Sequence, residues 1–281
     1  MGAYKVVKVI TNNLVRAKNT LNEEVIVSGK GIGFKKKQND LIPFTNIENE
    51  FVLRNPHESF LYDQLINNTS PKLIEISNSV IAYIQSNFEK QMNEHIHVSL
   101  TDHIAFLVKR HKLGITISDP FNNEIGILYP KETAIANQVI DMLNKELNIK
   151  IPKSESSFII LHIISATSDK TINDIQEINK IINLLMNVLE NHLNISLDRT
   201  TLNYARLVTH IRFMLERINR NETLQLPFEM VNMIKNSYPL CYSLGWKLVK
   251  IVQQELHKEI SENEIICISL HLYRFTQNNI K

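Results

Sequence analysis

The chain has 281 residues, 43% of them hydrophobic, and a formal net charge of +2 at pH 7. These values fit a folded protein of two or three domains and exclude a collagen-like or largely disordered chain. No apolar run reaches the roughly 18 residues that cross a bilayer, and no signal-peptide pattern opens the chain. We therefore expect a cytoplasmic protein without membrane insertion. Two distant cysteines, Cys241 and Cys267, indicate neither a disulfide nor a metal site.

The nearly neutral total charge hides a basic N-terminal segment. Residues 1–37 carry eight basic and two acidic side chains, a local charge of +6 (8 − 2). Such an asymmetry suggests contact with a polyanion at this end of the chain. The basic residues are Lys5, Lys8, Arg16, Lys18, Lys30, Lys35, Lys36 and Lys37.

Residues 3–54 predict a small antiparallel sheet. Short β-branched runs alternate with asparagines that can turn the chain. The segment Gly29-Lys30-Gly31-Ile32-Gly33-Phe34 matches neither the dinucleotide nor the P-loop pattern, so its glycines are expected to allow turns or close backbone contacts. About 55 residues make a marginal monomer, and we expect this module to dimerise.

From Tyr62 onward the apolar residues follow a helical period, after a polar linker near Asn55-Pro56. One helix start is indicated at Ser154 with Glu155, after Pro152. Another is indicated at Ser261 with Glu264, a pair that has capping-box spacing.

The helical part contains an internal repeat. Leu-Val-Thr-His-Ile-Arg-Phe, residues 207–213, follows Leu-Thr-Asp-His-Ile-Ala-Phe, residues 100–106, after 107 residues (210 − 103). A second pair of histidines is 109 residues apart (271 − 162). The same shifts superpose Arg110 on Arg217 and Glu155 on Glu264. We therefore predict duplicated helical domains of roughly 105 residues, each with two histidines on apolar helical stripes. The four are His103, His162, His210 and His271.

Several roles are open to these histidines. A core histidine is the plain alternative for any one of them, although recurrence at duplicated positions argues against packing alone. Metal ligation lacks cysteine partners and His-x-x-x-His spacing, and no hydrolase motif is present, so we expect no metal and no cofactor. A neutral imidazole can instead accept a phosphoryl group. Arg110 and Arg217, seven residues beyond His103 and His210, are candidate phosphate partners, or alternatively solvated charges.

The combination of a basic β module with duplicated histidine domains resembles the BglG/SacY/LicT-type transcriptional antiterminators, and the glucose-operon branch most closely. The residues that carry the resemblance are the glycine-rich segment 29–34, Asn93-Glu94-His95-Ile96-His97 running into residues 100–106, and Tyr238-Pro239-Leu240-Cys241-Tyr242. It implies a multidomain α and β protein: a four-stranded antiparallel RNA-binding domain (1–58), followed by two all-α helical-bundle regulation domains of the phosphotransferase system, or PTS (65–170 and 171–281).

The resemblance also implies RNA-contacting residues in the first domain. These are Asn13 for base edges, Gly29 for close backbone approach, Phe34 for stacking, Lys8 and Lys30 for phosphates, and Thr11. Sheet core is the alternative for Phe34. Many relatives have Arg at the position of Lys30 and Asn at the position of Thr11. Lysine lacks the planar guanidinium with which arginine can make a bidentate contact to a base.

The implied function is antitermination. A homodimer would bind a hairpin in the leader mRNA of a glucose PTS permease gene and prevent termination. His103, His162, His210 and His271 match the family's phospho-acceptor positions, with Asp102 in its usual place before the first. The glucose permease (enzyme II) would phosphorylate the first regulation domain and disable the dimer, and HPr would act on the second with less effect.

Two other functions compete with this regulator, which would not be an enzyme. A phosphohistidine relay protein of the PTS would have no use for an RNA-binding module. A DNA-binding activator with the same regulation domains would need a helix-turn-helix, and no such pattern precedes residue 60.

Overall fold

The structure is a computed structural model that describes residues 2–89, 91–117 and 124–279. The chain forms two compact units. The first contains residues 1–119 and 131–172, and the second contains residues 120–130 and 173–281. An N-terminal sheet is followed by helices throughout, which confirms the predicted class of a β module and all-helical domains.

The N-terminal sheet is antiparallel throughout, in the order β4-β1-β2-β3-β5. Alternate apolar side chains of the central strands, such as Val6, Val15, Ala17 and Val25, form its core. The resemblance implied four strands, and the fifth is the short segment that pairs with β3 before the first helix. The strands are β1 (Ala3–Val9), β2 (Leu14–Lys18), β3 (Glu24–Ser28), β4 (Leu41–Pro43) and β5 (Asn49–Phe51), with a 3-10 turn, η1 (Phe44–Asn46), after β4.

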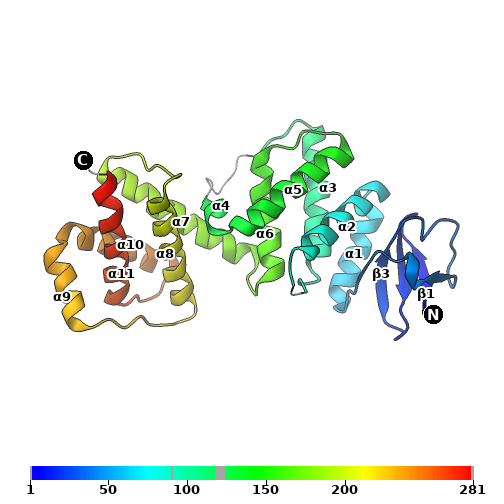
Figure 1. The fold of residues 1–281 in the computed structure, drawn as a ribbon, viewed down its shortest axis with the longest axis horizontal. Helices are drawn as coiled ribbons and strands as arrows, with labels where there is room; N and C mark the ends of the chain where they lie inside the picture. The colour runs from blue at the N-terminus through cyan, green and yellow to red at the C-terminus, as the bar shows by residue number, and fades with distance from the viewer. Residues whose placement is uncertain (1, 90, 118–123, 280–281) are drawn as a thin grey trace. The chain divides into compact units, whose positions relative to one another are not determined.

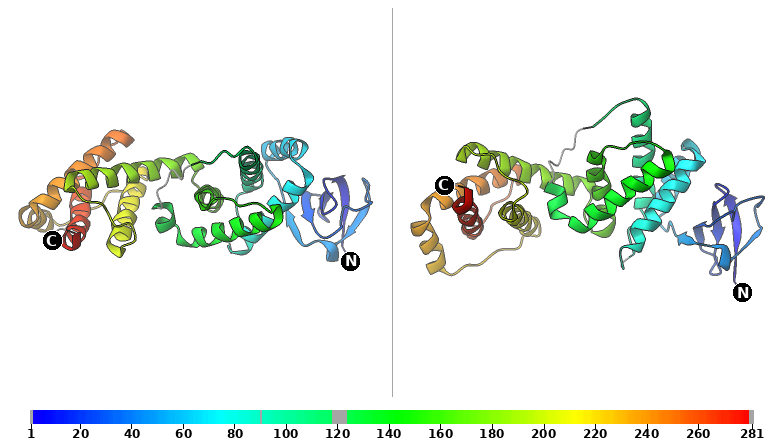
Figure 2. Two further views of the ribbon diagram at one scale, coloured as in Figure 1. Left: turned by 90° about the horizontal axis from the view of Figure 1, so that it is seen from above. Right: turned by 45° about the horizontal axis from the view of Figure 1, so that its top comes forward.

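The helices of the first unit begin at local sequence signals. Pro56 and Pro71 occupy first turns, and the side chains of Asn55 and Ser70 accept backbone N–H bonds there. Figures 1 and 2 show α1 and α2 beside the sheet, where Tyr62 and Ile74 join an apolar cluster with sheet residues. The helices are α1 (Pro56–Asn68), α2 (Pro71–Ser86), α3 (Ile96–Lys112), α5 (Pro130–Leu147) and α6 (Ser156–Thr167), with the 3-10 turn η2 (Lys153–Glu155).

The second unit is helical throughout its described residues. Its core combines apolar faces of α7, α8, α10 and α11, and includes the buried Leu207, Leu248 and Phe275. Within this unit, α8 and α10 both pack against α11. The helices are α4 (Glu124–Leu128), α7 (Ile172–Leu193), α8 (Leu202–Asn219), α9 (Phe228–Ser237), α10 (Pro239–Leu256) and α11 (Glu262–Asn279).

Both cysteines are free thiols, with Cys241 buried and Cys267 half-buried. In the described parts of the chain, no helix has the length and apolar character needed to span a membrane.

Candidate functional site

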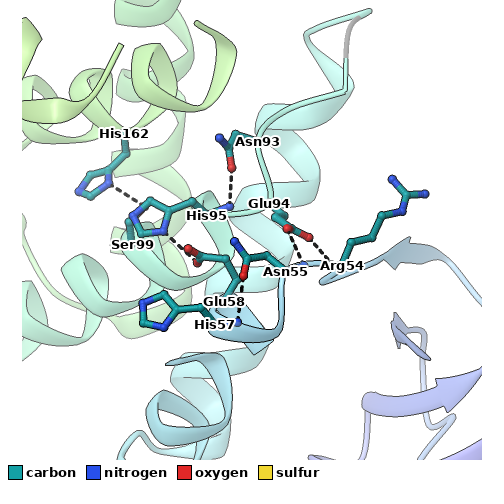
Figure 3. A network of polar contacts seen from close by, with 9 residues as sticks. All are labelled: Arg54, Asn55, His57, Glu58, Asn93, Glu94, His95, Ser99 and His162. Atoms are coloured by element: carbon teal, nitrogen blue, oxygen red, sulfur yellow. Dashed lines mark hydrogen bonds and ion pairs between the residues drawn. The ribbon is translucent and has the colours of Figure 1, made fainter. Parts of the chain in front are cut away.

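The first histidine pair joins two packed helices of the first unit. His103 lies on α3 and His162 on α6, and their ring centroids are 5.1 Å apart. The Nδ1 atom of His162 is 3.3 Å from the hydroxyl of Ser99, one turn before His103 on α3 (Figure 3). Residues 59 positions apart in sequence are therefore neighbours in one site, because α3 packs on α6.

An arginine–glutamate ion pair lies beside these rings. The guanidinium of Arg110 donates two hydrogen bonds, of 3.2 and 3.1 Å, to the carboxylate of Glu155. Arg110 is 6% exposed and Glu155 is 3% exposed, so the pair is shielded from water. The Nε2 atom of His103 is 3.9 Å from the same carboxylate. The glutamate thus faces both the arginine and the first histidine.

The first pair of rings is held in the neutral form. Burial lowers the pKa of His162 to about 3, with the neighbouring His103 adding to the effect. Burial also lowers the pKa of His103, although Glu155 acts in the opposite direction. A neutral imidazole has a free lone pair on one nitrogen, so both rings are chemically able to act as nucleophiles near pH 7.

The second unit repeats this arrangement. His210 on α8 and His271 on α11 stack with ring centroids 3.5 Å apart. Arg217 donates hydrogen bonds of 2.9 and 2.7 Å to the carboxylate of Glu264. Burial lowers the pKa of His271 to about 4, followed by the effects of His210 and Arg274. The pKa of His210 is also lowered, by burial first and then by Arg217 and Arg274.

The predicted residues around the histidines are thus only partly brought together. Arg110 is buried and Arg217 is partly exposed, and each is hydrogen-bonded to a buried glutamate. Asp102 is exposed on α3, and its charge has the smallest effect on the pKa of His103. Whether the three residues contact a phosphoryl group stays a prediction.

The glycine-rich segment of the N-terminal domain needs two of its glycines for close packing. A Cβ atom at Gly29 would lie 2.1 Å from the carbonyl oxygen of Asn46, and one at Gly33 would lie 2.3 Å from that of Thr11. Gly31 has φ +70° and open space around it. The segment is therefore anchored at both ends, as its sequence predicted, while its tip faces outward.

Two expected side chains of this segment are exposed to solvent, one between the anchors and one just after them. Lys30 is exposed and Phe34 is 58% exposed, which excludes the sheet core for Phe34. The ammonium of Lys35 is 5.3 Å from the Phe34 ring centroid. Of the other expected positions, Lys8 is exposed, whereas Thr11 is buried and accepts a hydrogen bond from the backbone of Asn13.

Like charges also lie opposite one another on β1 and β2. Lys5 pairs in register with Lys18, and Lys8 pairs with Arg16. Directly opposed like charges destabilise a sheet, and Arg16 is neutralised by Asp63 and Glu24. The exposed Lys5 and Lys8 are the charges on these strands that suit a polyanion.

Three glutamates at these sites were missed by the sequence reasoning. Glu155 and Glu264 were interpreted only as helix-start residues, although they repeat at the same 109-residue shift as the histidines (264 − 155). Their recurrence together with Arg110 and Arg217 is the signal that could have found the ion pairs. Glu75 accepts a hydrogen bond from Asn13, 62 residues earlier, and no sequence pattern indicates that contact.

The described residues contain no group of three or more His, Cys, Asp or Glu side chains that could hold a metal ion.

Comparison with known families and proteins covers the whole chain. Residues 4–60 match the CAT RNA binding domain, and residues 78–166 and 183–275 match the PRD domain. The chain is 40% identical over 275 residues to the PtsGHI operon antiterminator of Bacillus subtilis (strain 168), covering 98% of each protein. It is 37% identical over 276 residues to Protein GlcT of Staphylococcus haemolyticus (strain JCSC1435), covering 98% of this chain and 97% of that protein.

A solved structure resembles more than half of the chain. The crystal structure of GlcT CAT-PRDI matches with a TM-score of 0.54 and 42% sequence identity, over 59% of this chain and 98% of that one. The family matches, the full-length relatives and this structure agree with one another. The chain therefore belongs to the regulatory family of transcriptional antiterminators that join a CAT RNA-binding domain to PRD domains.

Proposed function

We propose that this protein is a cytoplasmic RNA-binding antiterminator whose activity is set by histidine phosphorylation. It binds a hairpin in the leader mRNA of a glucose PTS permease gene and prevents termination there. The observation that carries this proposal is the presence, in one chain, of an outward-facing basic surface and two histidine pairs built alike. As functional domains we propose residues 1–58, 65–170 and 171–281.

The RNA-binding role rests on the chemistry of the N-terminal surface. Exposed Phe34 offers a ring on which an unpaired base can stack, and Lys8 and Lys30 can bind phosphates. Asn13 can read a base edge, and Gly29 lets the backbone approach closely. Thr11, which is buried, supports Asn13 through its backbone hydrogen bond rather than contacting RNA.

The regulatory role rests on the neutral imidazole pairs. A ring nitrogen of His103, His162, His210 or His271 attacks the phosphoryl group of a PTS donor, an N–P bond forms, and the bond to the donor breaks. The product carries about two negative charges where a neutral ring was packed. We assign the glucose permease as donor to the first PRD domain and HPr as donor to the second.

Binding of the full-length chain to RNA tests the first part of this proposal. The probe is a hairpin from the leader transcript of the Bacillus subtilis ptsGHI operon, the operon for which a relative is named. We expect salt-dependent binding at micromolar protein or tighter, weakened about tenfold or more in Phe34→Ala because one stacked base is lost. Leu21→Ala, at another exposed apolar residue, is the control. Equal binding of a scrambled hairpin would contradict the proposal.

The proposed active form is a homodimer that phosphorylation disables. His103→Asp places a negative charge at the first ring, and we expect it to weaken dimerisation because the charge repels its copy or loosens the domain that carries it. Sedimentation velocity over a dilution series measures the effect, with His57→Asp, on an exposed residue of α1, as the control. An unchanged dimer at the lowest concentration contradicts this mechanism.

A further inference from the structure

The RNA-binding sheet packs against the first helical domain within the first unit. Leu14 and Ile26 of the sheet form one buried cluster with Tyr62 of α1 and Ile74 of α2. At the edge of this cluster, Arg16 donates a 2.7 Å hydrogen bond to Asp63. This is an apolar contact with a charged rim, so it stabilises one defined placement of the sheet.

The connection between the two domains is also held in place. The carboxylate of Glu94, just before α3, accepts hydrogen bonds from the backbone N–H groups of Arg54 and Asn55, of 2.6 and 2.9 Å (Figure 3). The adjacent His95 contacts Glu58 of α1 at 2.9 Å. Because two consecutive backbone N–H groups of the linker donate to the same carboxylate, the linker cannot reorient without losing both hydrogen bonds.

The contact places a carboxylate on a residue proposed to read RNA. The amide oxygen of Asn13 accepts a 2.7 Å hydrogen bond from the backbone of Gly31, and its amide nitrogen donates a 3.1 Å bond to Glu75 of α2. Both ends of the Asn13 amide are therefore engaged. A cavity of about 340 Å³ lies here, lined by Asn13 and Lys30 and by the carboxylates of Glu48 and Glu75.

These features are unfavourable for RNA. A base that reads the Asn13 amide through the N–H now bound to Glu75 displaces that carboxylate, and a phosphate entering the cavity would meet two carboxylates of its own sign. The backbone that presents Asn13 needs no change, since only the α2 side must withdraw. Docking of α2 therefore competes with RNA binding at Asn13.

We propose that the structure is an autoinhibited form, in which Glu75 of the first PRD domain occupies the base-reading group of the RNA-binding domain. The proposal rests on the proposed RNA-binding function and adds its regulation. The ligand that competes with Glu75 is an RNA base with a hydrogen-bond acceptor. The protein binds RNA from a minor, undocked state, so its apparent Kd exceeds the intrinsic Kd by the docked-to-undocked ratio.

Weakening the docked state must therefore tighten RNA binding. A hydrogen bond to a charged group, discounted for partial exposure, changes the docked-to-undocked ratio by roughly five- to tenfold. Glu75→Ala keeps a good helix former on α2 and removes the acceptor, so we expect its apparent Kd for RNA to fall by about that factor. Asp63→Ala removes the partner of Arg16 and is expected to act in the same direction.

The experiment compares four full-length proteins: wild type, Glu75→Ala, Asp63→Ala and Glu146→Ala. Glu146 is exposed on α5, so its variant removes the same charge outside the contact with the sheet. Fluorescence anisotropy with the labelled ptsGHI leader hairpin gives each apparent Kd, and circular dichroism checks that each protein is folded.

The proposal expects tighter binding by Glu75→Ala and Asp63→Ala, with Glu146→Ala equal to wild type. If the wild type binds the hairpin and Glu75→Ala binds equally or more weakly, autoinhibition by Glu75 is overturned while the RNA-binding function stands. An equal gain in Glu146→Ala also overturns it, because net charge then explains the effect. If none of the four proteins binds, the RNA-binding function fails and the inference fails with it.

Discussion

The two histidine sites share one plan and differ in surroundings. In each, an arginine seven residues beyond one histidine holds a glutamate seven residues before the other. In the first unit the side chain of Arg110 is 7% exposed, whereas that of Arg217 in the second is 26% exposed. His103 faces Glu155, while His210 is influenced by the positive charges of Arg217 and Arg274.

The duplicated domains thus keep the same framework and differ in the exposure of its arginine. A phosphoryl group at His103 would meet a buried carboxylate, so Arg110 would have to exchange Glu155 for the phosphate. At His210 the same group would meet arginines in a more open site. We therefore expect phosphorylation to disturb the structure of the first PRD domain strongly and that of the second weakly.

The largest effect is expected from removing the arginines. Arg110→Ala leaves Glu155 buried without its partner and should destabilise the first unit by about 3–5 kcal/mol. Arg217→Ala should destabilise the second unit less, by about 1–3 kcal/mol, because the Arg217 side chain is 26% exposed and water can take its place beside the buried Glu264. The only tryptophan, Trp246, lies on α10 of the second unit, so its fluorescence in urea follows that unit while circular dichroism follows both. Equal losses of unfolding free energy in the two units would contradict the proposed difference between the two ion pairs.

A charge placed on the ring sharpens the comparison. His103→Asp is expected to cost about 2 kcal/mol, since its carboxylate would face that of Glu155 in a shielded site. In a Glu155→Gln background the cost should largely disappear, whereas His210→Asp should be tolerated with or without Glu264→Gln. A double-mutant cycle from urea unfolding measures each coupling. A coupling near zero at the first site would show that Glu155 does not sense charge at His103.

The third expected effect is on how the free energy of unfolding depends on pH. The pKa of His162 is about 3 when folded and near 6.5 when unfolded, so between pH 7 and 5 the unfolded chain binds a proton that the folded chain does not. Stability therefore falls as the pH falls, by roughly 2 kcal/mol for this group over that range. His162→Gln should lose that part of the slope. His271→Gln should lose nearly as much over this range, because a folded pKa of about 4 also lies below pH 5. Identical slopes in wild type and His162→Gln would contradict the assigned burial.

Much of this architecture follows from local pattern. The helical period gave the face that carries Leu100, His103 and Ile104, and the 107- and 109-residue shifts gave the duplication and the histidine pairs. The resemblance of a few segments identified the family, which the comparisons confirmed. These features are readable because each depends on residues close in sequence or on a repeated motif.

Contacts between distant segments were not readable. Glu155 and Glu264 looked like helix-start residues because a glutamate there satisfies a local rule, and nothing local shows that an arginine approaches from another helix. Phe34 was ambiguous for a similar reason, since an aromatic residue after a strand fits either the core or the surface. The bond between Asn13 and Glu75 depends on how a whole domain packs, which no spacing encodes.

The two crowded glycines of the N-terminal domain have a consequence for how such a protein could change its preferred hairpin. Gly29 and Gly33 tolerate no side chain, whereas Gly31 between them stands in empty space and Lys30 beside it points to solvent. Substitutions can therefore accumulate at positions 30 and 31 while Gly29 and Gly33 stay unchanged. Gly31 has φ +70°, which asparagine adopts more readily than other L residues, so asparagine could replace it at a modest local cost. New regulatory specificities could then evolve there one substitution at a time.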